Sequence, residues 1–393
     1  SYGVLEVLAD TEITVENRKR RLIDEIDTIS SVSGGSFTAA YYGLFGDRIF
    51  DDFEDNFLNR DVQSVLVRNL FLPWRWFQLG SGDFGRSEMS ADYYDDILFR
   101  GGTFGDMAAT GGPLIRINAT DAGFGLQFPF EVEFFNIICS DLSDFSVARA
   151  VTASSAVPIL FSSLTIRNYA GSCGYAVPSW AQDALAGRDK TSRRYRVASQ
   201  YAKYLDREQK PYIHLYDGGL SDNLGVRSYL NLLSVMGDAY ETIKHRGYAD
   251  TRRLLFLVAN SQTELEPKFD HKEQSLGLSE TIMSSSSISL NEYTFESMTL
   301  LRQTGMQMQE QIAEHRCSDY LTQGKSTEGC DDIRVYVVEV SFNELTEEKD
   351  RKYLKHLPTT FRLTPEAVEK LRWAAREILS NSLEFQNFLN ELN

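Results

Sequence analysis

One serine, Ser33, stands at the break between a β-favouring run and a run of small, helix-tolerant residues. Residues 27–46 read DTISSVSGGSFTAAYYGLFG, so Gly34 and Gly35 follow Ser33 directly. A nucleophile on a sharp strand-to-helix turn needs small residues two positions before and after it, here Ser31 and Gly35. Free N–H groups at the helix start favour negative charge, and the Gly34 N–H could donate to an oxyanion. The same pattern is also typical of a helix cap, so alone it does not establish catalysis.

A second stretch, YIHLYDGGLSDNLG, repeats this logic with a carboxylate. Asp217 ends an apolar run and is followed by Gly218 and Gly219. Ligand sites of open α/β sheets lie at the ends of strands, although an aspartate before glycines is also common in plain turns. Two polar residues of this kind in one chain, each followed by Gly-Gly, predict that Ser33 and Asp217 act together.

The five histidines of the chain do not supply the base of a Ser-His-Asp triad. His214 lies three residues before Asp217, and the alternation of a strand puts the two on opposite faces. The other four lie among charged neighbours, which predicts surface positions: His245, His271, His315 and His356. A Ser-Asp dyad is therefore predicted. Because a free aspartate has a pKa of about 3.9, burial must raise it to make a useful base. An ester, with its better leaving group, suits such a dyad better than an amide.

Composition excludes several classes of function. The 393 residues carry a net charge of −16, which argues against nucleic-acid binding and against purely electrostatic docking on anionic lipid. No run of about 18 apolar residues predicts a membrane-spanning helix, and no C-x-x-C pair predicts a zinc site. Cys139 is expected to pack as a small hydrophobe. Cys317 and Cys330 flank a polar loop and form either a disulfide or two free thiols.

The elements that must position these residues alternate along the chain. Strand-like runs occur at 26–32, 114–119, 126–135, 212–216, 254–259 and 333–342, and helical patterns at 36–45, 51–70, 147–155, 224–237, 292–315 and 365–392. This alternation predicts an α/β fold with a central, mostly parallel sheet and helices on each side. Residues 123–135 alternate as an antiparallel edge hairpin would. We expect a catalytic core over 1–260, with a helical excursion at 51–110. Residues 261–393 are expected to complete or pack on the same domain.

The aromatic stretch VRNLFLPWRWFQLG, residues 67–80, is a candidate lipid contact. Phe71, Trp74 and Trp76 are residue types that suit a membrane interface. The alternative is a packed corner of the helical excursion, because apolar clusters more often belong to a core. VPSW at 177–180 is a weaker candidate. The terminal helix is expected to pack on the sheet or on a partner subunit.

Five strings, in order, resemble the patatin-like phospholipase family in its bacterial branch. SVSGGS resembles the nucleophile motif, and DGG at 217–219 the second dyad motif. INATD at 117–121, ASSAVPILF at 153–161 and DNLG at 222–225 also resemble strings of that family. The resemblance covers roughly residues 1–225. It implies a three-layer α/β/α sandwich and lipid acyl hydrolysis without a metal or other cofactor, with Ser33 as nucleophile and Asp217 as base.

Two departures from the family pattern keep other functions open. Ser31 stands where the family normally has glycine, and the family's glycine-rich oxyanion loop would precede Ser1, where we expect further residues. Without such a loop the protein would be a weakly active lipid-binding protein. An acyltransferase or another serine esterase would use the same dyad. The expected substrate is a phospholipid or other lipid ester at a membrane surface, and the expected location is membrane-associated or extracytoplasmic; the sequence does not indicate an oligomeric state.

Overall fold

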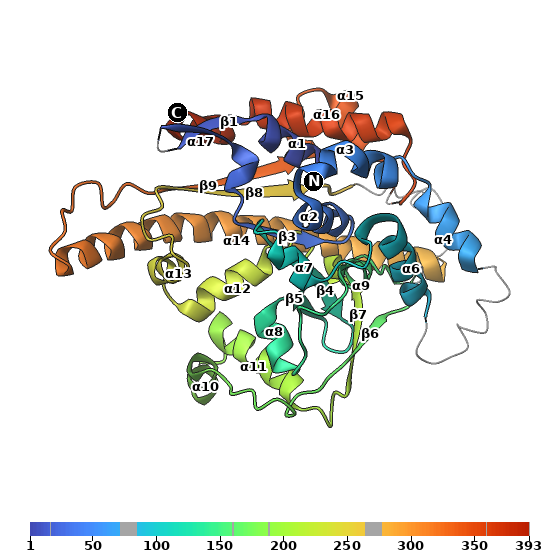
Figure 1. The fold of residues 1–393 in the computed structure, drawn as a ribbon, viewed down its shortest axis with the longest axis horizontal. Helices are drawn as coiled ribbons and strands as arrows, with labels where there is room; N and C mark the ends of the chain where they lie inside the picture. The colour runs from blue at the N-terminus through green and yellow to red at the C-terminus, as the bar shows by residue number, and fades with distance from the viewer. Residues whose placement is uncertain are drawn as a thin grey trace.

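The computed structural model describes residues 1–15, 17–70, 85–158, 161–187, 189–263, 277–358 and 360–392. A five-stranded sheet lies at its centre (Figure 1). Its strands are β3 (Thr28–Val32), β4 (Leu114–Asp121), β5 (Leu126–Phe130), β6 (Leu164–Arg167) and β7 (Tyr212–Asp217). β3 and β4 are parallel, whereas β4 pairs antiparallel with β5 and β7, and β6 pairs antiparallel with β7. The predicted α/β class is confirmed, and the sheet is mixed, with its parallel pairing at β3–β4.

β3 and β7 share one edge of β4 and point toward each other. β3 covers residues 114–118 of β4 and ends with Val32 opposite Asn118. β7 covers residues 119–121 and ends with Asp217 opposite Ala119. Because β3 runs parallel and β7 antiparallel to β4, their carboxyl ends meet at the same point. The serine that follows β3 and the aspartate that ends β7 are thereby brought together.

The hairpin of β4 and β5 is present, but its second strand is shorter than predicted. β5 ends at Phe130, and helix α8 (Val132–Ile137) follows instead of strand to residue 135. Phe134 of this helix packs on Phe128, with ring centroids 4.7 Å apart, and Phe135 packs on Phe130 at 5.9 Å. The apolar pair at 134–135 therefore reaches the core from a helix, which an alternating strand pattern cannot reveal.

A second, two-stranded parallel sheet consists of β8 (Arg253–Asn260) and β9 (Arg334–Ser341). Helix α14 (Leu278–Thr322) runs along one face of this pair, and α16 (Pro365–Asn381) and α17 (Leu383–Leu392) lie on the other (Figure 1). Val337 clusters with Met298 of α14, whereas the adjacent Tyr336 contacts Phe388 of α17, as the alternation of a strand requires. The C-terminal part of the predicted terminal helix therefore packs on this second sheet.

Two of the predicted helices are divided in the structure. The terminal helix breaks at Ser382, whose hydroxyl accepts the Phe385 N–H at 3.3 Å and so caps α17. The helix predicted at 51–70 is α3 (Ile49–Phe53), the π-helical segment η3 (Glu54–Leu58) and α4 (Val62–Leu70). The other helices are α1 (Tyr2–Asp10), α2 (Gly34–Phe45), α6 (Arg86–Tyr94), α7 (Phe104–Ala109), α9 (Val147–Ser154), α10 (Ser179–Ala186), α11 (Arg193–Leu205), α12 (Arg227–Met236), α13 (Ala239–His245) and α15 (Glu348–Lys355). Strands β1 (Glu12–Val15) and β2 (Arg18–Arg21) form a separate hairpin. The remaining short elements are the π-helical segment η4 (Asp95–Phe99) and the 3-10 helices η1 (Leu22–Glu25), η2 (Gly46–Arg48), η5 (Gly218–Leu220) and η6 (Phe342–Glu344).

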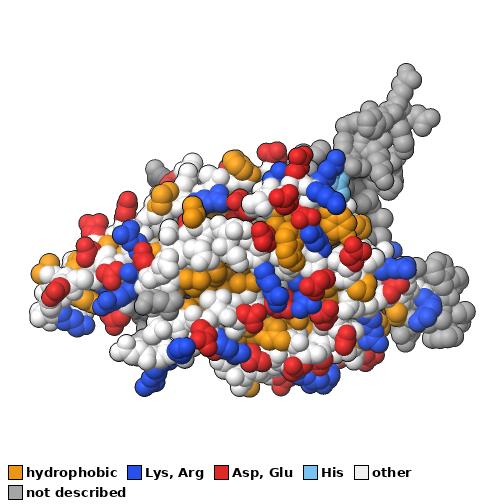
Figure 2. Space-filling model, turned by 90° about the horizontal axis from the view of Figure 1, so that it is seen from above, with side chains coloured by type: hydrophobic (Ala, Val, Ile, Leu, Met, Phe, Trp, Pro, Cys, Tyr) orange, Lys and Arg blue, Asp and Glu red, His pale blue; other side chains and the backbone are white. Residues whose placement is uncertain are grey.

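The first helix and the C-terminal helices pack closely together. A Cβ on Gly3 of α1 would lie 2.9 Å from the Cα of Arg372 in α16, so this contact requires glycine. The Arg372 guanidinium also contacts Glu6 of α1 at 2.6 Å, and both side chains are largely buried. Acidic and basic side chains are interspersed around hydrophobic patches on the face seen from above (Figure 2).

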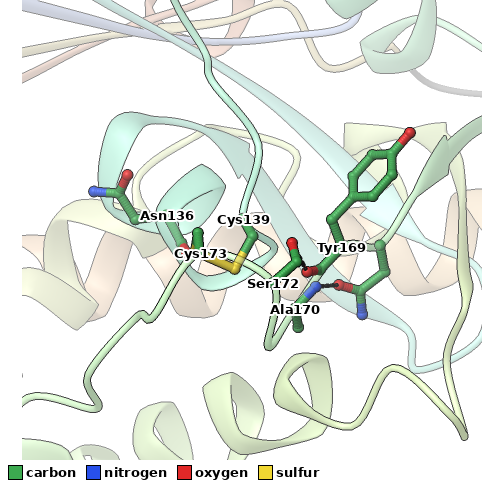
Figure 3. Close-up of a disulfide and its surroundings, with 7 residues drawn as sticks. Asn136, Cys139, Tyr169, Ala170, Ser172 and Cys173 are labelled. Atoms are coloured by element: carbon green, nitrogen blue, oxygen red, sulfur yellow. Dashed lines mark hydrogen bonds between the residues drawn. A yellow bond between two sulfur atoms is a disulfide. The ribbon is translucent and has the colours of Figure 1, made fainter.

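All four cysteines form disulfides. Cys139 is bonded to Cys173, with Cα atoms 5.4 Å apart, which joins the end of α8 to the loop after β6 (Figure 3). The prediction that Cys139 packs as a small hydrophobe is therefore wrong, because the chain turns at this residue (φ 52°) and directs it toward that loop. Cys317 and Cys330 form the second disulfide, between the end of α14 and the loop before β9.

Candidate active site

Ser33 occupies the turn from β3 into α2 in a backbone conformation that is rare for a residue with a side chain. Its φ is 50° and its ψ is −127°. Such a conformation costs roughly 1–3 kcal/mol and persists only where the surrounding structure imposes it. Here the Ser36 N–H donates to the Ser33 carbonyl at 2.9 Å, which starts the helix immediately after the turn. The turn directs the Ser33 hydroxyl away from α2 and toward the end of β7.

The Ser33 hydroxyl donates to Asp217. Its Oγ lies 2.7 Å from Asp217 Oδ2, and the Gly219 N–H donates to Oδ1 at 2.8 Å. Asp217 is only 8% exposed. Burial raises the pKa of Asp217 to about 6, and the hydrogen bonds from Ser33 and Gly219 partly oppose that rise. The carboxyl is therefore ionised at neutral pH and is a stronger base than a free aspartate.

The glycines of the two motifs have different roles. A Cβ on Gly34 or Gly35 would meet nothing within 4 Å, so the predicted steric need for a small residue at Gly35 is wrong in this structure. A Cβ on Gly218 would lie 2.2 Å from the Asn118 carbonyl oxygen. On Gly219 it would lie 3.0 Å from Asp217 Oδ1. Glycine is required after the aspartate, whereas the space above the glycines after the serine is open.

The open space above the serine turn exposes the start of α2. The Ser33 N–H is occupied, because it donates to Ser154 Oγ at 2.9 Å. Within the described residues, neither the Gly34 N–H nor the Gly35 N–H has a hydrogen-bond partner. Both N–H groups belong to the first turn of a helix, where they are available to an anion. The structure thus retains Gly34 as a candidate oxyanion donor.

A buried chain of serines supports the serine turn. Ser154 Oγ donates to the Asn118 carbonyl at 2.6 Å and lies 2.9 Å from Ser36 Oγ. Ser36 Oγ in turn donates to Ser31 Oγ at 3.2 Å. Ser31, where the sequence departs from the glycine of the family it resembles, is thus hydrogen-bonded. The string ASSAVPILF contains Ser154, but the sequence alone did not single it out, because its role depends on the approach of α9 to the serine turn.

Ser33 and Asp217 line a cavity of about 1630 Å³. Residues of β3 and β8 form two of its walls, and apolar side chains such as Leu254 and Leu371 contribute to the lining. Each of these strands pairs with a single neighbour in the described part of the chain, so each has an edge without a strand partner. The dyad therefore opens onto a large, mainly apolar space.

The histidines lie away from the dyad where the structure describes them. His214 is exposed and contacts Thr165 Oγ1 at 3.0 Å from Nδ1, as the strand alternation predicted. His315 contacts Asp238. His271 lies outside the described residues, as do Phe71, Trp74 and Trp76. Trp180 of the weaker lipid-contact candidate packs edge-on against Tyr201, at 5.8 Å. In the ranges that the structure describes, no helix is both long enough and apolar enough to cross a bilayer.

Comparison with known proteins supports the resemblance noted in the sequence. Residues 1–230 match the family model described as patatin-like phospholipase. This region is more than half of the chain and contains both Ser33 and Asp217. A search of curated proteins found no match. The family implies lipid acyl hydrolysis in general. On this evidence the chain belongs to the patatin-like phospholipase family.

Proposed function

We propose that this protein is a hydrolase of phospholipid or other lipid esters, with Ser33 as nucleophile and Asp217 as general base. The observation that carries the proposal is the 2.7 Å hydrogen bond from Ser33 Oγ to a buried carboxylate. A serine hydroxyl at its ordinary pKa is a weak nucleophile, and an adjacent base activates it. The strained turn at Ser33 and membership of the family are independent support.

The proposed reaction has two halves that use the same pair. Ser33 Oγ attacks the acyl carbonyl carbon while its proton passes to Asp217 Oδ2. The Gly34 N–H stabilises the oxyanion. Collapse of the tetrahedral intermediate breaks the ester bond, and Asp217 protonates the departing alkoxide, which leaves Ser33 acylated. Water then attacks the acyl-enzyme and gives its proton to Asp217. The second collapse releases the fatty acid as Ser33 Oγ recovers that proton.

Release of fatty acid from defined phospholipids tests this proposal. Ser33→Ala should reduce hydrolysis to background, and Asp217→Asn should lower kcat by about 10²–10⁴-fold, the usual contribution of a general base. Ser155→Ala is the matched control, because within the described residues the hydroxyl of this buried serine bonds only the Val151 and Thr152 carbonyls, at 2.8 and 3.4 Å. Near-full activity of Asp217→Asn would contradict the dyad.

The same assay separates the alternatives. Added acceptor alcohol that takes up the acyl group in preference to water would indicate an acyltransferase, which shares the acyl-enzyme. Binding of phospholipid vesicles without fatty-acid release would indicate a weakly active lipid-binding protein. If the 67–80 stretch contacts lipid, replacing Trp74 and Trp76 by serine should weaken vesicle binding more than hydrolysis of a soluble ester. Equal losses would contradict that contact.

We also propose that the protein works outside the cytoplasm, at a lipid surface. The support is that all four cysteines are paired, as Cys139–Cys173 and Cys317–Cys330. Disulfides form and persist in oxidising compartments and are rare in reducing ones.

A further inference from the structure

Ser33 follows β3 and Asp217 ends β7, and these two strands are not hydrogen-bonded to each other, so another group must hold them at a fixed separation. β3 and β7 both pair with β4, and they meet at Asn118 and Ala119. We infer that Asn118 is a positioning residue, which holds the Ser33 turn and the Asp217 loop in register. This inference rests on the proposed function, since it concerns the alignment of the same dyad.

Asn118 is fully buried and bonds the end of β3 in two ways. Its Nδ2 donates to the Ser31 carbonyl at 3.0 Å and to Ser30 Oγ at 3.0 Å. Its main-chain carbonyl accepts the Ser154 hydroxyl at 2.6 Å, and Ser154 Oγ accepts the Ser33 N–H at 2.9 Å. Asn118 therefore bonds the residues that precede Ser33 in β3. Through Ser154 it also holds the main-chain N–H of Ser33 itself.

The opposite side of Asn118 reaches the loop that follows Asp217. Asn118 Oδ1 accepts from Gln127 Nε2 at 2.9 Å, and the same nitrogen donates to Asp222 Oδ2 at 3.0 Å. Asp222 Oδ2 also accepts the Arg227 N–H at 2.8 Å, and the carboxyl is 1% exposed. A continuous hydrogen-bonded path thus joins β3 to the loop that directly follows Asp217.

Two direct contacts also join β3 and Asn118 to the segment that follows Asp217. Ser30 Oγ donates to the Gly225 carbonyl, at the end of the same loop, at 2.6 Å. The backbone at Gly218 lies against the Asn118 carbonyl oxygen, only 2.2 Å from where a Cβ would be. The segment 218–225 is therefore held at both ends. Gly218 packs against Asn118 itself, and the Gly225 carbonyl is bonded by Ser30, which accepts from Asn118.

The path needs an amide at Asn118. The Ser31 carbonyl can only accept, so Asn118 must direct its NH₂ toward it. Asn118 Oδ1 is then left to accept from Gln127, whose NH₂ also faces the Asp222 carboxylate. A carboxylate cannot donate to β3, and a hydroxyl has one hydrogen, so it cannot donate both to the Ser31 carbonyl and to Ser30 Oγ while it accepts from Gln127. The geometry therefore selects asparagine at this position rather than a polar residue in general.

Asn118→Ala, assayed with a soluble p-nitrophenyl ester, tests the inference. We expect kcat to fall by about 10–10²-fold with KM within about twofold, because misplacement of reacting groups by about 1 Å can cost about 10²-fold. The acidic limb of the pH–rate profile should also move to higher pH, since loss of the Ser33 hydrogen bond raises the pKa of Asp217. A merely structural residue would not move that limb.

Asn168→Ala is the matched control. Asn168 is an equally buried amide, whose Nδ2 donates to the Tyr204 and Lys210 carbonyls at 2.8 and 3.0 Å, outside this network. Its loss should lower the Tm without changing kcat or the pH limb of the folded enzyme. If Asn118→Ala does not fold, Gln127→Met is the variant that tests the positioning role. It should lower kcat by about 2–10-fold, because it removes the two hydrogen bonds of Gln127 Nε2 that link Asn118 to Asp222.

The outcomes that contradict the positioning role and the proposed function differ. A folded Asn118→Ala or Gln127→Met enzyme with the kcat and pH limb of the wild type would overturn the positioning role alone, provided Ser33→Ala is inactive. Wild-type protein without any Ser33-dependent hydrolysis would overturn the proposed function, and the positioning role with it.

Discussion

At the scale of single residues, Asp217 combines two demands that usually conflict. As a base it must be ionised at neutral pH, and as a strong base it must hold its proton more tightly than a free aspartate. Burial raises its pKa to about 6, which meets both demands. The Ser33 hydroxyl and the Gly219 N–H, at 2.7 and 2.8 Å, prevent a larger rise by stabilising the charged form.

The rate of ester hydrolysis should therefore fall below about pH 6. Protonated Asp217 cannot take the Ser33 proton, so kcat/KM should drop about tenfold per pH unit on the acidic side. A pH profile with a soluble ester, over a range in which the fold persists by circular dichroism, measures this limb. A rate that stays flat down to pH 4.5 would show that Asp217 is not the base.

The same shift in pKa makes Asp217 unfavourable for stability. In the unfolded chain the carboxyl ionises near pH 4, whereas the folded chain keeps its proton to about pH 6. Below pH 4 the carboxyl is protonated in both states, so it makes no pH-dependent contribution to the free energy of unfolding. As the pH rises from 4 through 6, the unfolded state loses its proton first and the free energy of unfolding falls. Two units of pKa correspond to about 3 kcal/mol. Asp217→Asn, which is never charged, should thus raise the free energy of unfolding by about 2–3 kcal/mol at pH 8.

Urea unfolding at pH 8 and pH 4 measures this effect, with Ser33→Ala as the inactive control that keeps the carboxyl. Asp217→Asn should exceed the control at pH 8 and match it at pH 4. An equal difference at both pH values would mean that packing, and not ionisation, separates the two variants.

At the scale of elements, the site depends on two strands that meet end to end. The sequence indicated that Ser33 and Asp217 each end a strand, and that much could be read from apolar runs followed by glycines. The antiparallel direction of β7 could not be read, because direction depends on connections far along the chain. The roles of Asn118 and Ser154 depend on β4 and α9 approaching β3, which no local pattern specifies. The continuous layers of an α/β/α sandwich over the whole sheet stay a prediction.

The contrasting glycines of the two motifs give a test at this scale. Gly218→Ala should destabilise the fold by more than 2 kcal/mol, in the range of severe single substitutions, because a Cβ there would meet the Asn118 carbonyl at 2.2 Å. Gly35→Ala should be neutral or stabilising by about 0.5–1 kcal/mol, since its Cβ meets nothing within 4 Å and alanine favours a helix. Thermal unfolding of both variants measures the difference. Equal losses of stability would contradict the packing described at Gly218.

At the scale of the whole molecule, packing joins the N- and C-terminal parts of the chain, and each disulfide closes a local loop within one of these parts. Helix α1 rests on α16 through Gly3 and the ion pair of Glu6 with Arg372. The Cys139–Cys173 disulfide closes a separation of 34 residues and Cys317–Cys330 one of 13. No spacing rule in the sequence distinguished these pairs from thiols, because the pairing depends on which loops the fold brings together.

The disulfides predict a measurable redox state. Protein isolated from its host under rapid thiol alkylation should carry no alkylated cysteine until it is reduced, and then four. Peptide mass spectrometry should recover the Cys139–Cys173 and Cys317–Cys330 cross-links. Free thiols at all four positions in freshly quenched protein would contradict the proposed extracytoplasmic location.

Labelling by a fluorophosphonate tests the central claim most directly, because this probe forms a bond only with an activated serine. The account predicts one adduct per chain, located on Ser33 by mass spectrometry. The adduct should be absent in Ser33→Ala, should form much more slowly in Asp217→Asn and should form normally in Ser155→Ala. An adduct on another serine, or equal labelling of the wild type and Asp217→Asn, would contradict the account.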